Sequence, residues 1–210
     1  MLLGEIKIQA LSLMYPDASS RFDDSTPEGV ENAIYVLKSD HNFSGLLEAA
    51  VGALNRAFSV IEERGLSGVK CADKALSVCQ RTNDGRVIIL PDKDFLYLER
   101  LLCHKGGKTY ACFGETMENK IYTDMVGDVY TLVYREKIPR VKRITPDSLE
   151  VELPTGLSEA IPYFIMSELL AREDTQRAQE AREHFYKALE SCERHAAPCH
   201  QCFQIIYSME

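Results

Sequence analysis

The sequence predicts an α+β protein, a helical bundle of N-terminal and C-terminal helices with a small antiparallel β-sheet inserted between them. Three observations support this class. Apolar residues recur every three or four positions over 43–64, short β-branched and aromatic runs separated by turn residues fill 86–134, and helical spacing returns after residue 155. Helices and strands are therefore segregated along the chain, which favours α+β over an alternating parallel sheet. We expect one domain over 1–210, comprising a helical part (1–68 and 155–196), a β insert at about 84–153 and a C-terminal tail (197–210).

The N-terminal part is expected to be helical with one long break. Residues 3–14 mix apolar and polar positions as a short amphipathic helix does, and Pro16 ends it. The stretch 16–29 is rich in Pro, Asp, Ser and Gly and predicts a loop, and 30–37 is a second short helix. The clearest helix spans 43–64, and Gly65 follows where a C′ glycine belongs.

The insert reads as a series of short strands. Turn-forming segments separate the runs from one another, as in an antiparallel sheet. One run alternates strictly, which places Tyr130, Leu132 and Tyr134 on one face. The predicted strands are Arg86–Leu90, Phe95–Leu102, Thr109–Phe113, Lys120–Thr123 and Val129–Tyr134.

Two helices are expected to close the chain. The first covers 158–171, with Pro162 in its first turns, where a missing N–H costs least. The second is capped by Asp174 or Thr175 and runs to about Arg194, with Cys192 on its apolar stripe.

Composition and charge limit the function. The chain has 210 residues, is 45% hydrophobic and carries a net charge of −8. Its apolar runs are shorter than the roughly 18 residues of a transmembrane helix, and its first residues lack the basic segment of a signal peptide. We therefore expect no membrane partner and no sequence-specific nucleic-acid binding. The basic stretch 135–143 is either a solvated edge or a contact for an acidic partner.

Cysteine and histidine residues at the C-terminus are the sharpest local signal. Thiolates and imidazoles at this spacing can close a tetrahedral zinc site, so a zinc-stabilised interaction or regulatory domain is the alternative hypothesis. The other interpretation is a tail of free thiols, which requires no cofactor. The candidate ligands are Cys192, His195, Cys199 and Cys202.

Catalytic patterns are missing from the sequence. The common nucleotide-binding and hydrolase motifs do not occur. Cys103 and His104 are neighbours, but neighbours on a strand point to opposite faces and cannot act together. The acidic pairs 23–24, 62–63 and 173–174 fall in loops or at helix ends, where caps and surface roles are expected. We therefore predict that the protein is not an enzyme.

The segment 144–192 resembles the C-terminal part of head–tail connector (adaptor) proteins of tailed bacteriophages and prophages, including those like tail tubular protein A. In these proteins a strand ending in a basic stretch leads to an acidic segment, a helix and a last helix with a Y…AL motif. The upstream part is similar too, with a long amphipathic helix and a turn at Leu90-Pro91-Asp92. The Cys/His-rich tail and the loop at 16–29 depart from the pattern. The matching residues are Leu153-Pro154, Ala160-Ile161-Pro162-Tyr163, Glu168-Leu169-Leu170, Asp174, Ala178, Phe185-Tyr186 and Ala188-Leu189.

The resemblance implies a structural role. Such proteins are non-enzymatic subunits that self-associate into a ring, typically of twelve, and join the portal protein to tail proteins. They are made in the cytoplasm of the bacterial host and end in the virion. Their C-terminal segment often docks onto the portal, and the apolar residues Phe203, Ile205, Ile206 and Tyr207 suit that contact. Alternatively, these four residues pack on the protein's own core.

Overall fold

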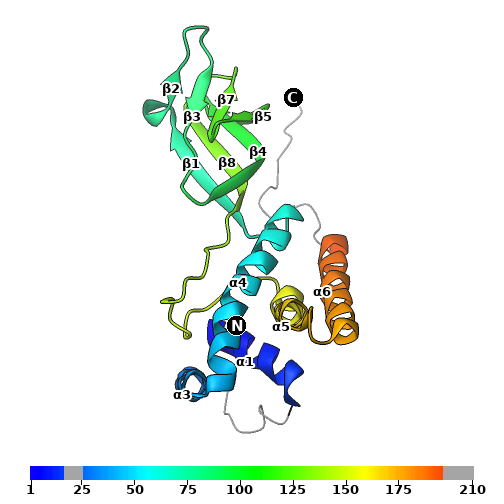
Figure 1. Cartoon of the computed structure of the whole chain (residues 1–210). Helices are drawn as coiled ribbons and strands as arrows, with labels where there is room; N and C mark the ends of the chain where they lie inside the picture. Colours follow the sequence, from blue (N-terminus) through cyan, green and yellow to red (C-terminus); the bar gives the residue numbers. More distant parts are fainter. Residues whose placement is uncertain (17–25, 196–210) are drawn as a thin grey trace. The chain divides into compact units, whose positions relative to one another are not determined.

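A computed structural model describes residues 1–16 and 26–195, and it confirms the α+β class (Figure 1). N-terminal helices precede two small antiparallel sheets, and a helix pair follows. The α-helices are α1 (Leu3–Met14), α3 (Pro27–Ser39), α4 (His41–Glu63), α5 (Thr155–Leu170) and α6 (Thr175–His195). The strands are β1 (Val69–Ala75), β2 (Gln80–Arg81), β3 (Val87–Ile89), β4 (Phe95–Lys105), β5 (Lys108–Cys112), β6 (Glu115–Met117), β7 (Lys120–Thr123) and β8 (Val129–Glu136), and a 3-10 turn, η1 (Leu76–Val78), follows β1.

The chain divides into two compact units. Unit 1 comprises Met1–Leu66 and Arg140–Glu210, and unit 2 comprises Ser67–Pro139. The first strand begins at Val69 and the last ends at Glu136, so the strands lie earlier in the chain than the predicted insert of 84–153. Strand β1 was missed because most of its side chains are exposed, so it shows little hydrophobic alternation. The stretch after β8 contains Pro139 and Pro146, which cannot donate to a strand ladder.

Unit 1 is organised around α5, which contacts α1, α4 and α6. Buried apolar side chains from all five helices fill its interior, and Leu54, Ile61, Ile161 and Phe185 are inaccessible or nearly so. The predicted helix 43–64 corresponds to α4, whose buried residues follow the expected three- and four-residue spacing. Burial of this continuous stripe is what makes a 23-residue helix stable here.

Several helix ends follow the sequence signals. Gly65, after the end of α4, has a φ of +66°, as expected of a C′ glycine. The start of α4 differs, because Asp40 rather than Asn42 or Ser44 is the cap and accepts a hydrogen bond from the Asn42 amide. Asp174 rather than Thr175 caps α6, since its carboxylate accepts from the Arg177 amide. Pro162 was misplaced by the sequence argument. Helix α5 begins at Thr155, so the proline lies inside the helix rather than in its first turns.

Unit 2 consists of two four-stranded antiparallel sheets. Sheet B has the order β1-β8-β4-β5, and sheet C has the order β2-β3-β7-β6. One hydrophobic core takes residues from both sheets, including Ile89, Ile121 and Leu132. Tyr130, Leu132 and Tyr134 all belong to this core, which confirms that the three side chains share one face of β8.

Candidate functional site

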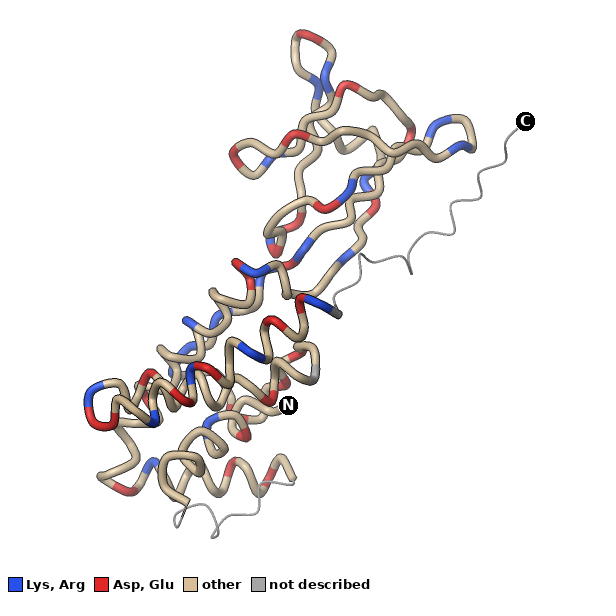
Figure 2. The backbone as a smooth tube through the Cα atoms, turned by 90° about the vertical axis from the view of Figure 1, so that its right-hand side faces the viewer, with Lys and Arg blue, Asp and Glu red and all other residues tan. Residues whose placement is uncertain are grey.

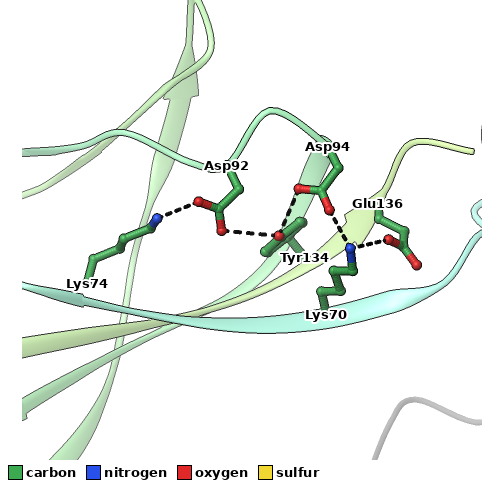
Figure 3. A network of polar contacts seen from close by, with 6 residues as sticks. All are labelled: Lys70, Lys74, Asp92, Asp94, Tyr134 and Glu136. Carbon is green, nitrogen blue, oxygen red and sulfur yellow. Dashed lines mark hydrogen bonds and ion pairs between the residues drawn. The ribbon is translucent and has the colours of Figure 1, made fainter. Parts of the chain in front are cut away.

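The most connected polar group of unit 2 lies where β1 and β8 meet the turn before β4 (Figure 3). Lys70 Nζ lies between the carboxylates of Asp94 and Glu136, 2.7 Å from the latter. The Tyr134 hydroxyl donates to a carboxylate, with Asp94 at 3.1 Å and Asp92 at 3.4 Å. Lys74 Nζ lies 2.6 Å from Asp92. Because Lys70 and Tyr134 are register partners, their side chains share one face of sheet B.

Contacts within this network hold Lys70, Asp94 and Tyr134 in their usual ionisation states by shifting their pKa values. The hydrogen bonds to Asp94 and Glu136 raise the pKa of Lys70, and the hydrogen bond from Lys70 lowers the pKa of Asp94. Burial, followed by the hydrogen bond to Asp94, raises the pKa of Tyr134 to about 12. A general acid or base needs a pKa near the working pH, and these shifts all lead away from neutrality. The network therefore fixes the turn 91–94 over the core and is unsuited to proton transfer.

Two hollows on the surface are small. One, of about 170 Å³, lies beside this network and is lined by Pro91, Asp92, Lys93, Phe95, Asn119 and Lys137. The other, of about 290 Å³, lies in unit 1 between α1 and α5. Both fall below the roughly 300–1,000 Å³ of typical small-molecule sites.

Burial raises the pKa values of two thiols in unit 2, those of Cys79 and Cys112. Cys103 is fully buried in the core, whereas the neighbouring His104 forms hydrogen bonds with Thr109 and Thr131 of the adjacent strands. The two side chains therefore do not form a Cys–His pair, as the strand argument predicted. Burial, followed by the proximity of Cys103, raises the pKa of Cys112 to about 12. A nucleophilic cysteine needs the opposite shift.

Most of the C-terminal candidates lie outside the described residues. Cys199 and Cys202 do so, as do the proposed partner-binding residues Phe203, Ile205, Ile206 and Tyr207. His195 is the last residue of α6. Cys192 is half-buried on α6, and its pKa is raised by burial, which fits the expected apolar stripe. Residues 1–16 and 26–195 contain no group of three or more potential metal ligands.

Arginines of the basic stretch 135–143 pair with acids of this chain. In unit 2, Arg135 contacts Glu99 and donates to the Ser67 carbonyl. In unit 1, Arg140 pairs with Glu62. Arg143 lies 3.3 Å from Glu48. These pairs favour the interpretation of a solvated edge over a surface that collects phosphate groups.

An ion triad in unit 1, with Lys7 and Asp147 buried and Lys38 exposed, was missed by the sequence argument. Lys7 of α1 and Lys38 of α3 both contact the carboxylate of Asp147, at 2.6 and 3.0 Å. The Asp147 carbonyl also accepts from the Gly4 amide at the start of α1. No local pattern could reveal these contacts, because they join residues more than 100 positions apart.

No protein-family model matches the chain, and a search of curated proteins finds no match either. In the described part of the chain, no helix has the length and apolar character needed to cross a membrane.

Proposed function

We propose that this chain is a non-enzymatic structural subunit of the head–tail connector of a tailed phage or prophage. In this proposal, copies form a ring, typically of twelve, that joins the portal protein to the tail proteins. The protein is made in the cytoplasm of the bacterial host and is incorporated into the virion. The observation that carries the proposal is the resemblance of segment 144–192, in a chain whose order of helices, antiparallel insert and helix pair is the one that the resemblance implies.

The residues that carry the resemblance have structural roles. Ile161, Phe185 and Leu189 are buried between helices. The Glu168 carboxylate accepts from Arg56 of α4 and Arg182 of α6, both at 2.9 Å, and so links three helices. The resembling residues thus build the pair of helices α5 and α6 and supply no catalytic group. This fits an assembly protein, which acts through the surfaces that its fold presents.

The properties of the polar groups also support this proposal. Burial, followed by the hydrogen bond to Asp94, raises the pKa of Tyr134, and burial raises the pKa values of Cys79, Cys112 and Cys192. None of these shifts favours catalysis near neutral pH. A structural subunit needs no such group.

Native mass spectrometry of the full chain tests the proposal, both alone and mixed with the portal protein of the same phage or prophage. We expect a closed ring of one fixed stoichiometry, either alone or on the portal. A monomer that ignores the portal and carries one tightly held zinc would contradict the proposal and favour the zinc-stabilised domain.

The tail provides a second test. A variant in which Phe203, Ile205, Ile206 and Tyr207 are replaced by serine should keep the ring but lose its binding to the portal. Gln204→Ser within the same segment is the matched control, because it removes no apolar side chain. Unchanged portal binding by the fourfold variant would show that these residues are not the docking segment.

A further inference from the structure

The hollow beside the polar network of unit 2 gathers side chains from three separate segments of the chain. Its volume is about 170 Å³. Lys93 comes from the turn before β4, Asn119 from the turn between β6 and β7, and Lys137 directly follows β8. Nitrogen donors that lie far apart in the sequence therefore line one small concave surface.

Backbone contacts hold these segments in place. Phe95 is the register partner of Glu136, which brings the turn before β4 beside the end of β8. The Lys137 amide then donates to the Asp94 carbonyl at 2.6 Å. In the turn between β6 and β7, Asn119 has a φ of +58°, a left-handed conformation that asparagine adopts more readily than most residues. The hollow is thus built by strand register and turns, before any ligand is present.

The side-chain donors around the hollow are unmatched. Lys93 and Lys137 are exposed, and neither forms an ion pair within residues 1–16 and 26–195. The Asn119 side chain likewise has no hydrogen-bond partner in these ranges. Asp92 is the one acid that lines the hollow, and Lys74 Nζ, 2.6 Å away, neutralises it. The positive charges of Lys93 and Lys137 are therefore left without a counter-charge.

This surplus of positive charge is local. Basic and acidic residues are interspersed along the backbone of unit 2 (Figure 2). Arg135, two residues before Lys137, is already paired with Glu99. A long polyanion gains affinity from a row of phosphate contacts, which interspersed charges do not supply. The hollow is also smaller than the sites of typical organic ligands. Its size and its charge therefore favour one small anionic group.

We propose that this hollow binds a phosphate group, either as inorganic phosphate or as the monoester of a small molecule. A phosphate monoester carries a charge of about −1.5 to −2 near neutral pH and has three strong acceptor oxygens. The two ammonium groups of Lys93 and Lys137 match that charge, whereas a carboxylate carries a single charge. The Asn119 amide supplies a third donor to the oxygens. The organic part of a monoester stays outside the hollow, which has room for the phosphate group alone.

Phosphorus NMR of inorganic phosphate, titrated with the full chain at constant ionic strength, tests the site, because bound phosphate broadens the signal. Lys93→Gln with Lys137→Gln should weaken binding about tenfold, since two exposed charge contacts are lost. Asn119→Gly keeps the left-handed turn, loses the amide and should weaken binding by a smaller factor. Lys105→Gln with Lys108→Gln is the matched control, because it removes the same charge at the β4–β5 turn of the same unit. It should change the affinity by less than about twofold.

Glycerol phosphate in place of inorganic phosphate distinguishes the two sources. Tighter binding of the ester identifies a monoester as the ligand, and tighter binding of the ion identifies free phosphate. Absence of broadening, or equal weakening by the control pair, would overturn the inference. Acetate that binds as tightly as phosphate would also overturn it, as would tighter binding, through the same lysines, of duplex DNA that lacks terminal phosphates. None of these measurements requires a ring, so the connector proposal is tested separately.

Discussion

Replacing Asp147 by alanine is expected to destabilise unit 1 strongly. The Asp147 side chain is 9% exposed and that of Lys7 is 6% exposed, so their ion pair is shielded from water. Removing the carboxylate leaves the Lys7 ammonium buried without a counter-charge, which typically costs about 3–5 kcal/mol. Lys38, at 55% exposure, contributes much less, since exposed ion pairs are worth at most about 1 kcal/mol.

Urea unfolding followed by far-UV circular dichroism measures this effect, because every α-helix of the described ranges belongs to unit 1. Lys38→Met is the control and should cost no more than about 1 kcal/mol. A Lys7→Met, Asp147→Leu double variant removes both buried charges and should recover most of the stability. A loss below about 1 kcal/mol in Asp147→Ala would refute the reasoning, because it would mean that water solvates the Lys7 ammonium.

The remaining predictions concern the pH dependence of stability, the hydrogen bonds of two side chains and the C-terminal tail. Burial alone would raise the pKa of Asp147, but the hydrogen bonds from two lysines lower it below 3.8. The ionised Asp147 carboxylate therefore stabilises the fold fully above about pH 4, and this stabilisation is lost as the pH falls through the lowered pKa. Acid titration followed by helicity measures the loss. Tyr134→Phe removes the hydroxyl between two carboxylates and should cost about 1.5–3 kcal/mol in urea unfolding followed by tyrosine fluorescence. Asn55→Ala breaks both amide hydrogen bonds to the Val141 backbone, at 2.8 and 2.9 Å, and should cost about 1–3 kcal/mol by thermal unfolding. Cys199→Ser with Cys202→Ser should leave portal assembly unchanged in native mass spectrometry, whereas its loss would favour a zinc role.

Sequence periodicity predicted the elements whose burial follows a simple period. Helix α4 has a continuous apolar stripe, and in β8 the alternate residues Tyr130, Leu132 and Tyr134 all face the core, so both were recognised. Strand β1 was not, because an edge strand with mostly exposed side chains has no such period. Pro162 was misplaced because helix α5 is apolar nearly all round, so its start could not be read from an amphipathic pattern.

The polar contacts were beyond prediction for a different reason. The partners of Asp147 are fixed by the packing of α1 and α3, and those of Tyr134 by the register of β4 with β8, which places the turn before β4 beside Tyr134. Neither the register nor the packing leaves a local mark in the sequence. Only a local cap, Asp174, was anticipated, because this cap and its target amide are three residues apart.

The polar side chains of the described residues separate into two kinds, and this bears on where function lies. Lys70, Asp94 and Asp147 are already matched by partners in their own copy, so they stabilise the fold and offer little to another molecule. Asp73 and Lys108 lie at opposite edges of one sheet and have no ion pair within the described ranges. Charges left unmatched within one copy are the ones that another molecule can match.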